Sequence, residues 1–440
     1  MLLREDMVDF EPGSVVDSAG TVFYWDNGVF RAINRHFVDL YRRILNSDYA
    51  ADLFSAGLVY TTVSAVTLEG YPMCLEHKKV RFVSVWKEWC SSMIKDAALM
   101  VLRLNLELAK RGLITKDIQP GNVIFDISDG PKPIWVDFGS IVPLEAPPRR
   151  FPLDAFHAHW LVPLWLLSRG YHDMGRLVFL EQRREGGVKR LLSKRPWRWV
   201  PPAYHVLRRK SAHLSTVDLL ERLIDYVEGL SLVPPRTAWT DYGQGGMPPV
   251  DEEDEFSPKA QAVNSILARF APGTVLDVAC NKGWFAELAA SMGSQIVAFD
   301  ADDASISHLY ERSKEAKLQI LPLVMDFCWP TAPFGLGISK AGATERLRCD
   351  TSLVLALVHH LVFKQGLRFQ TIARIVHLFS GRRAIIEFVP RDDKYVGKWV
   401  RPEHDWYTLD CFIRSLGKHF SHVEVHESFP KPRMLVVCEN

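Results

Sequence analysis

The chain has 440 residues, 48% of them apolar, which is enough for two or three domains with buried cores. The 53 basic and 52 acidic side chains leave a net charge of +1, which excludes a general electrostatic attraction to nucleic acid or anionic membranes. Seven cysteines without a CxxC pair predict free thiols rather than disulfides or zinc ligands. Acidic residues close to Met1 and apolar runs too short for a bilayer predict a cytoplasmic protein without a secretory signal or a membrane span.

The front part of the chain, residues 1–235, is predicted to be an α+β domain. Two short strands, Val22–Trp25 and Val29–Ile33, flank the sequence Asp26-Asn27-Gly28, and Asn-Gly is a strong signal for a hairpin turn. A long amphipathic helical stretch follows over Val85–Lys110. Shorter strand and loop pieces come next, before a region with mostly helical spacing.

A basic run lies in that helical region, between Arg183 and Lys210, with Trp197 and Trp199 among the basic residues. Basic side chains mixed with aromatic ones can grip RNA or an anionic glycan. Such a run is more often the solvated face of a helix, and we favour that interpretation. A nucleic-acid partner therefore stays open but has no stronger support.

The stretch from Trp239 to Glu255 contains glycines, prolines and then an acidic run, the composition of a surface connection. It divides the chain into residues 1–235, a linker of residues 236–257 and a second domain of residues 258–440. An alternative is that Tyr242 and its neighbours fold over a cofactor of the second domain.

In the second domain, segments with strand and helix patterns alternate. The predicted helices are Pro258–Phe270, Trp284–Met292, Ala304–Ala316, Phe369–Phe379 and Leu409–Phe420. The predicted strands are Thr274–Ala279, Gln295–Asp300, Ile320–Asp326, Ser352–Val358, Ala384–Val389, Val423–Glu427 and Met434–Cys438. Alternation predicts an α/β fold with a mainly parallel sheet covered on both faces, and the last two strands predict a hairpin at the sheet edge.

Acidic side chains stand at the ends of the first three of these strands. Asp277 lies on the first strand, where it can receive the ammonium group of a bound amino acid, and small residues after it permit a sharp turn close to a ligand. Asp300 ends the second strand, as expected for a carboxylate that pairs with ribose hydroxyls. Asp326 ends the third, where it can accept a hydrogen bond from an adenine amine.

This pattern resembles the class I methyltransferases, which have a seven-strand Rossmann-like domain and use S-adenosylmethionine. The resemblance implies that Asp277, Ala279, Asn281 and Gly283 contact the methionine part of this cofactor. It also implies that Asp300 holds the ribose and Asp326 the adenine. Ala279 and Asn281 replace glycines of the family pattern, and Asn281 either weakens binding or takes a left-handed conformation, which Asn tolerates. A dinucleotide-binding Rossmann domain is the alternative, but it needs a tighter glycine pattern and lacks the terminal hairpin.

The methyl acceptor is expected beyond the carboxyl ends of the fourth and fifth strands. His359 and His360 follow the predicted fourth strand, and either can take a proton from a hydroxyl or amine. Glu387, on the fifth strand, can orient that histidine or take the proton itself. A metal site made by these three residues has no ligand spacing to support it, so we expect no metal.

The first domain carries a second resemblance. Asp117 precedes Asn122 by five positions, and Asp137-Phe138-Gly139 follows, as in the catalytic and metal-binding loops of the protein-kinase superfamily. The resemblance implies an α+β domain in which Asp117 lies near an accepting hydroxyl and Asn122 and Asp137 hold magnesium. No Gly-rich loop is present, Arg31 is the only substitute for the strand lysine, and Thr115 stands where His is usual. We therefore expect a degenerate, vestigial site and disfavour Mg²⁺ and ATP as cofactors.

The whole chain resembles a set of bacterial proteins, one of them a host-specific nodulation protein, in which such a kinase-like half precedes a methyltransferase half. The first hypothesis is therefore methyl transfer to an unidentified O or N nucleophile, with a small molecule or glycan favoured as the acceptor. Membership of the set implies a role in making or modifying a nodulation signal. One alternative is an enzyme that both phosphorylates and methylates a glycan. The other is a regulator or scaffold without catalytic activity.

Overall fold

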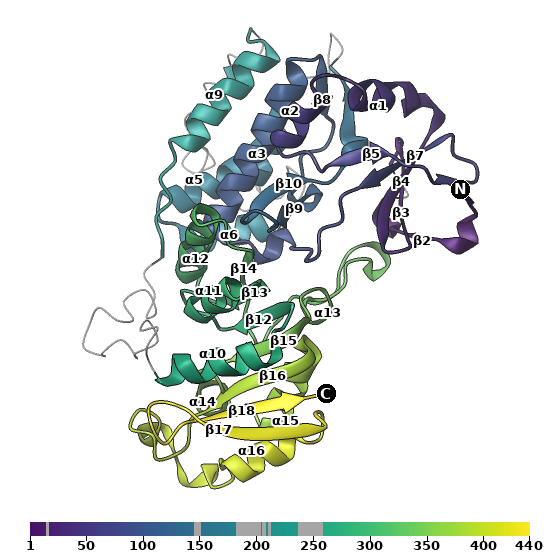
Figure 1. Cartoon of the computed structure of the whole chain (residues 1–440). Coiled ribbons are helices and arrows are strands. Elements are labelled where there is room, and N and C mark those ends of the chain that lie inside the picture. Colours follow the sequence, from purple (N-terminus) through teal and green to yellow (C-terminus); the bar gives the residue numbers. More distant parts are fainter. Residues whose placement is uncertain (15–16, 145–150, 182–203, 205–207, 210–212, 236–257) are drawn as a thin grey trace. The chain divides into compact units, whose positions relative to one another are not determined.

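A computed structural model describes residues 1–14, 17–144, 151–181, 204, 208–209, 213–235 and 258–440. The predicted linker and most of the basic run lie outside these residues. The chain forms two compact units, which divide mainly at residue 235. Residues 127–131 belong to unit 2 and residues 333–340 to unit 1. Unit 1 is drawn mostly in purple to teal in Figure 1, and unit 2 mostly in green to yellow.

Unit 1 begins with an antiparallel sheet. Its strands, in spatial order, are β2 (Asp9–Phe10), β3 (Gly20–Trp25), β4 (Gly28–Ile33), β7 (Met73–His77) and β5 (Thr61–Val63). The predicted hairpin is β3–β4, but its turn is Asp26-Asn27, one residue earlier than the Asn-Gly signal. Both residues have positive φ, 43° and 62°, and Gly28 already pairs with Trp25. Asp and Asn tolerate this left-handed conformation, which lets the turn match the strand twist.

The long predicted helix of unit 1 is α3 (Ser91–Ala109). It starts later than expected because Trp86–Glu88 form a separate 3₁₀ turn and Cys90 is extended. Two small antiparallel pairs follow, β8 (Leu113–Thr115) with β11 (Ile141–Pro143) and β9 (Val123–Asp126) with β10 (Lys132–Trp135). The remaining elements are β1 (Leu2–Leu3), β6 (Thr67–Leu68), α1 (Val38–Leu45), α2 (Ala50–Ser55), α4 (Leu153–Phe156), α5 (Val162–Ser168), α6 (His172–Glu181) and α9 (Thr216–Glu228).

Unit 2 is built on a seven-stranded sheet with the order β14-β13-β12-β15-β16-β18-β17. The first five strands are parallel, and β18 pairs antiparallel with both β16 and β17. The bounds are β12 (Thr274–Val278), β13 (Gln295–Asp300), β14 (Ile320–Val324), β15 (Cys349–Val354), β16 (Ser380–Phe388), β17 (His422–Glu427) and β18 (Met434–Glu439). The predicted mainly parallel sheet with a hairpin at its edge is confirmed. This strand order is that of a methyltransferase-like α/β fold.

Helices cover both faces of this sheet. Residues of α10 (Pro258–Phe270), α11 (Trp284–Ser291) and α12 (Asp303–Glu315) pack with Ala298 and other strand residues in one buried cluster. The next residue, Phe299, points to the opposite face, where its ring lies 5.7 Å from Phe379 of α15 (Phe369–Phe379). Shorter helices complete the unit, namely α13 (Ala343–Arg346), α14 (Val358–Phe363) and α16 (Leu409–Leu416).

The wrong end predicted for the fourth strand affects the site. The fourth strand ends at Val354, not at Val358, and Ala356 takes a positive φ of 50° in the turn that follows. Helix α14 then starts at Val358, so His359 and His360 lie in its first turn instead of at a strand end. The apolar run Leu353–Val358 misled the prediction because periodicity does not separate a buried strand from a short buried helix.

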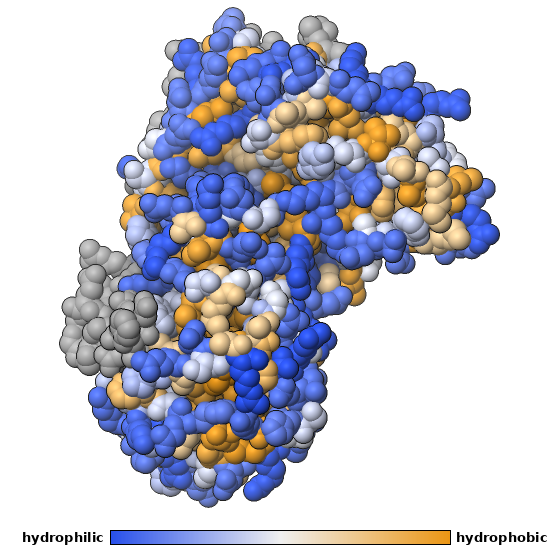
Figure 2. Space-filling model, viewed as in Figure 1, coloured by the Kyte–Doolittle hydropathy of each residue, from blue (hydrophilic) through white to orange (hydrophobic). Residues whose placement is uncertain are grey.

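On the face that Figure 2 shows, hydrophilic residues predominate, with apolar residues in patches between them. Among the described residues, no helix combines the length and the apolar character needed to cross a bilayer.

Candidate functional site

Unit 2 contains a cavity of about 420 Å³ at the carboxyl ends of the parallel strands. Seven of the residues predicted from the sequence line it, namely Asp277, Ala279, Asn281, Asp300, Asp326, His359 and His360. Gly283 and Glu387, which were predicted with them, do not line it. The cavity therefore brings the expected cofactor residues and the expected acceptor histidines to one place.

The turn after β12 follows the predicted path. Ala279, Asn281 and Gly283 all have positive φ, 55°, 50° and 82°. These are the positions that are glycines in the family pattern, so the substitutions keep the left-handed backbone instead of changing it. Asn adopts this conformation at little cost, whereas Ala279 is strained by about 1–2 kcal/mol.

Gly283 shapes the cavity indirectly. A Cβ atom at this position would lie 2.5 Å from the side chain of Leu309. The glycine therefore lets the start of α11 pack closely against α12, in the way that the third glycine of a nucleotide-binding turn allows close helix packing.

Three carboxylates surround the cofactor part of the cavity. Asp277 is buried at the end of β12. Asp300 Oδ2 accepts a hydrogen bond from Asn281 N at 3.0 Å, and Oδ1 accepts one from Asp302 N at 2.9 Å. Burial raises the pKa of the Asp300 carboxyl, although these backbone hydrogen bonds oppose the shift. Asp326 Oδ1 accepts a hydrogen bond from Cys328 N at 2.7 Å.

This arrangement fits S-adenosylmethionine. Each carboxylate oxygen has a second lone pair beyond the backbone bonds it already accepts, so Asp300 can still receive ribose hydroxyls. Acidic groups suit the ammonium and amine donors of the ligand, while Phe285, Phe299 and Met325 add apolar walls. Such a mixture of apolar lining and a few placed polar groups is typical of cofactor sites.

His359 stacks on Trp399, and His360 lies beside both rings at a tilt. The His359 and Trp399 rings are nearly parallel, 16° apart in orientation, with centroids 5.9 Å apart, and the His360 ring lies 4.3 Å from His359. Burial lowers the pKa of His359 to about 2, helped by His360, Arg433, Lys364 and Lys259. Burial and Lys364 lower the pKa of His360 to about 4. Both imidazoles are therefore neutral at pH 7, which is the form that accepts a proton.

Glu387 occupies a different place from the one expected of a base. It is fully buried, its Oε2 lies 3.0 Å from Lys259 Nζ, and the same oxygen accepts a hydrogen bond from Ala356 N at 2.9 Å. Ser428 Oγ donates to its other oxygen at 3.3 Å. Glu387 thus fixes the turn that leads into α14, and so positions His359 without lining the cavity.

Sequence reasoning missed several residues of the cavity. Tyr395, Lys398 and Trp399 come from the segment after β16, and Lys364 follows α14. The acceptor was expected beyond the end of the fifth strand, but nothing in the sequence indicated which later side chains turn back into the cavity. Lys259, the buried partner of Glu387, does not line the cavity but was missed as well, because a lysine on an amphipathic helix normally faces water.

Within the described part of the chain, no group of three or more His, Cys, Asp or Glu residues is placed to hold a metal ion.

The predicted site residues of unit 1 lie in neighbouring loops. The Asn122 carbonyl accepts a hydrogen bond from Val136 N at 2.9 Å, which places Asn122 beside the segment that carries Asp137. Asp117 Oδ1 accepts a hydrogen bond from Gln119 N at 3.1 Å, so this carboxylate stabilises the loop that carries it. Asp137 pairs with Arg31, Nη2 to Oδ1 at 2.8 Å. Burial raises the pKa of the Asp137 carboxyl, and the Arg31 charge opposes that shift.

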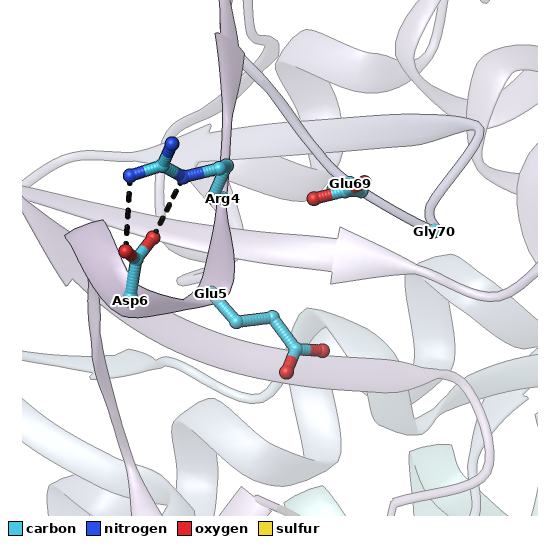
Figure 3. Close-up of a pocket in the computed structure, with 5 residues that line it drawn as sticks. All are labelled: Arg4, Glu5, Asp6, Glu69 and Gly70. Atoms are coloured by element: carbon cyan, nitrogen blue, oxygen red, sulfur yellow. Dashed lines mark hydrogen bonds and ion pairs between the residues drawn. The ribbon is translucent and has the colours of Figure 1, made fainter.

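A separate hollow in unit 1 is lined by Arg4, Glu5, Asp6, Glu69 and Gly70 (Figure 3). All five residues are exposed, and the Arg4–Asp6 pair, 3.0 Å from Nε to Oδ1, lies at the surface. An exposed ion pair of this kind contributes little to binding or stability, so this hollow does not have the features of a binding site.

No family model matches the chain. The chain is 25% identical to the nodulation protein NoeA of Rhizobium meliloti (strain 1021), in an alignment that covers 94% of this chain and 92% of NoeA. The predicted resemblance to a set of bacterial proteins that includes a nodulation protein is thereby confirmed.

Three solved structures show weaker similarity. The bifunctional kinase-methyltransferase WbdD is 18% identical, with a TM-score of 0.32, over 44% of each chain, so this chain spans less than half of WbdD. Magnesium protoporphyrin IX methyltransferase of Synechocystis PCC 6803 is 15% identical over 46% of this chain and 91% of its own, with a TM-score of 0.32. The N-methyltransferase NodS of Bradyrhizobium japonicum WM9 is 14% identical over 42% of this chain and 98% of its own, with a TM-score of 0.31.

The chain is thus similar to NoeA over nearly its whole length, and its unit 2 has the α/β fold that characterises the class I methyltransferases.

Proposed function

We propose that the protein is an S-adenosylmethionine-dependent methyltransferase that acts on an O or N nucleophile, with unit 2 as the catalytic unit. The observation that carries this proposal is the single cavity that joins Asp277, Asp300 and Asp326 to His359 and His360. Three acids at the ends of successive parallel strands match the three polar parts of the cofactor. Two neutral imidazoles in the same cavity supply a base for an acceptor.

S-adenosylmethionine supplies an electrophilic methyl group whose transfer leaves the electron pair of the broken bond on sulfur. The protein's part is to bind and to align. In the proposal Asp277 pairs with the ammonium group, Asp300 with the ribose hydroxyls and Asp326 with the adenine amine. The left-handed turn at Ala279 and Asn281 lets the backbone approach the methionine part. Alignment of the acceptor with the methyl group supplies most of the rate enhancement.

On the acceptor side, His359 or His360 takes the proton that the nucleophile loses as it gains the methyl group. At pH 7 each ring is neutral and has a lone pair for that proton, but its lowered pKa makes it a weaker base than a free imidazole. Glu387 acts as a positioning residue through Ala356 N and the Lys259 pair. Trp399, stacked on His359, fixes the plane of the ring that faces the cavity.

For unit 1 we propose a degenerate kinase-like domain that helps to bind or select the acceptor. Its antiparallel sheet, the long helix α3 and the neighbouring loops of Asn122 and Asp137 support this reading. Because Arg31 already pairs with Asp137, we do not propose magnesium and ATP as cofactors of the enzyme. The similarity to NoeA, a nodulation protein, supports an acceptor that belongs to a nodulation signal, with a small molecule or glycan favoured.

The test is calorimetric titration of the purified full chain with S-adenosylmethionine. Wild-type protein is expected to bind with a micromolar Kd, and Asp300→Ala is expected to lose binding. Asp410→Ala, which removes an exposed carboxylate of α16 away from the cavity, is the matched control and is expected to bind like the wild type. No binding by wild type or control would reject the proposal and favour a scaffold without catalytic activity.

A further inference from the structure

The acceptor part of the cavity in unit 2 is lined by charges opposite to those of its cofactor part. The carboxylates among the described lining residues lie at or just beyond the ends of β12, β13 and β14, and they are Asp277, Asp300 and Asp326. The lysines and the arginine that line the cavity all come from later segments, and they are Lys364, Lys398 and Arg433. One cavity therefore separates negative side chains from positive ones.

The three cations differ in exposure and in partners. Arg433 is buried, and its Nε lies 3.0 Å from Asp393 Oδ2, so a carboxylate neutralises its charge. Lys364 and Lys398 are exposed, and within the part of the chain that the structure describes Lys398 forms no ion pair. Exposed lysine side chains can turn their ammonium groups toward a ligand at the mouth of the cavity. We call Lys364, Gln365 and Lys398, the exposed residues that line the acceptor part, the acceptor rim.

Lys364 lies close to the two histidines. Its Nζ is 4.7 Å from the centre of the Trp399 ring, and the centroid of that ring lies 5.9 Å from His359 and 5.3 Å from His360. Burial lowers the pKa of His360 to about 4, and the charge of Lys364 adds to this shift. A negative group paired with Lys364 would oppose that addition and make His360 a stronger base.

The volume of the cavity limits how much of an acceptor can enter it. The cavity holds about 420 Å³, toward the lower end of the range for ligand pockets, and S-adenosylmethionine joins a whole nucleoside to an amino acid. With the cofactor bound, little more than the reacting group of the acceptor fits inside. The rest of the acceptor then lies at the acceptor rim.

We propose that the methyl acceptor is a small organic anion, whose charged group binds Lys364 and Lys398 while its hydroxyl or amine faces His360. The nucleophile gains the methyl group and gives its proton to His360, and the electron pair of the broken bond stays on sulfur. An anion is attracted by both lysines and by the sulfonium charge of the cofactor, all of which repel a cation. Ammonium groups act as point charges, so a carboxylate and a phosphate are both suitable. The inference rests on the proposed function, because it takes this cavity as the site of methyl transfer.

The test compares four sugars that share a ring and differ in charge, namely glucuronate, the phosphate ester of glucose at its primary hydroxyl, glucose and glucosamine. Binding to the full chain is followed by ligand-observed NMR, which detects weak affinities, with and without S-adenosylhomocysteine. We expect both anions to bind at least about fivefold more tightly than glucose, and glucosamine to bind most weakly. Tighter binding of glucuronate than of the phosphate ester would identify a carboxylate as the preferred group, and the reverse order a phosphate.

The salt dependence is measured on the wild type. Raising NaCl from about 0.05 M to about 0.5 M is expected to remove most of the preference for anions, because salt screens exposed charges. A preference that persists at high salt would overturn the inference. This measurement needs no variant, so it decides the question even if a substitution impairs folding.

The double variant Lys364→Gln/Lys398→Gln removes both lysine charges of the acceptor rim. It is expected to bind the four sugars with similar affinities and to bind S-adenosylmethionine like the wild type. The matched control is Lys418→Gln/Lys431→Gln, which removes two exposed lysines of unit 2 that do not line the cavity, and it should keep the preference for anions. Thermal unfolding is recorded for each variant.

The outcomes separate this inference from the proposed function. If the wild type binds S-adenosylmethionine but binds the anions no better than glucose, or if the preference survives in Lys364→Gln/Lys398→Gln, the inference is overturned and the proposed function stands. Lysine-dependent binding of anions by a protein that does not bind S-adenosylmethionine would reject methyl transfer. The anion would then not be a methyl acceptor, although its binding site would stand.

Discussion

The ammonium group of Lys259 lies 3.0 Å from the carboxylate of Glu387, and both side chains are buried, with 2% and 0% exposure. This pair connects the first turn of α10 to the end of β16, two segments separated by more than a hundred residues. Glu387 also receives the amide of Ala356, so the ion pair is tied to the turn that places His359. The position of the histidine thus depends on a charge at the start of the domain.

Removing one partner of this pair is expected to be strongly destabilising. Lys259→Met leaves the Glu387 charge in the core without its closest cation, at a cost of about 3–5 kcal/mol in the free energy of unfolding. Urea denaturation measures this change. The exposed pair Arg269–Glu424, 2.9 Å apart, is the matched control, and Arg269→Met is expected to cost about 1 kcal/mol or less. Similar effects of the two substitutions would show that burial does not decide the energetics of the Lys259 pair.

Substitution by glycine is expected to have opposite effects on stability at Ala279, in the left-handed turn, and at Ala290, in a helix. Ala279→Gly relieves strain at a φ of 55°, so we expect unchanged or higher stability, by up to about 1 kcal/mol, and retained S-adenosylmethionine binding. Ala290→Gly, inside α11, is expected to destabilise by about 1 kcal/mol, because glycine is a poor helix former. Thermal unfolding and calorimetry measure both effects. A loss of stability in Ala279→Gly as large as that in Ala290→Gly would contradict the strain at position 279.

Gly283 and Gly293 have similar φ angles, 82° and 91°, so substitutions at the two positions separate backbone strain from steric overlap. Gly283→Ala adds a Cβ 2.5 Å from Leu309, whereas Gly293, with a φ of 91°, has no atom within 4 Å of an added Cβ. Gly293→Ala is expected to cost only backbone strain, about 1–2 kcal/mol. Gly283→Ala is expected to cost a further 1–3 kcal/mol, roughly the penalty of overpacking. Leu309→Ala should reduce this extra cost in the double variant, and the absence of such coupling would argue against the contact.

The buried histidines predict a pH dependence of stability. The folded-state pKa of His359 is lowered to about 2, from an ordinary value near 6.5, because burial disfavours the charged ring. Below about pH 6.5 the unfolded chain binds a proton that the folded chain does not, so stability falls as the pH falls. The stability of the folded state with neutral His359 is fully present above about pH 6.5. As the pH falls from there toward the folded-state pKa, the free energy of unfolding decreases by up to about 1.4 kcal/mol per pH unit.

The change is measured by urea denaturation of the wild type between pH 7 and pH 5. His359→Asn is expected to show a shallower decline than the wild type over this range. His422→Asn, at an exposed position of β17, is the matched control and should decline like the wild type. A decline that is the same in His359→Asn and in the wild type would mean that other groups cause it.

The sequence by itself determined the architecture of unit 2. The bounds of α10, β13 and α15 agree with the predicted ones, because the two helices have helical periodicity and β13 is a short apolar run bounded by polar residues. The acids Asp277, Asp300 and Asp326 were found because strand ends in an open parallel sheet meet at one edge. Local pattern and topology therefore suffice for the cofactor part of the cavity.

Only the tertiary structure decided the acceptor part of the cavity and the roles of the charged residues in it. A lysine at position 259 and a glutamate at position 387 look like surface or catalytic groups in a sequence, and only packing shows that they neutralise each other in the core. In the same way, Lys364 and Lys398 look like ordinary surface lysines in the sequence, and only the fold brings them to the rim of one cavity. The physical reason is that the energy of a charge depends on burial and on its nearest partner, and neither follows from local sequence.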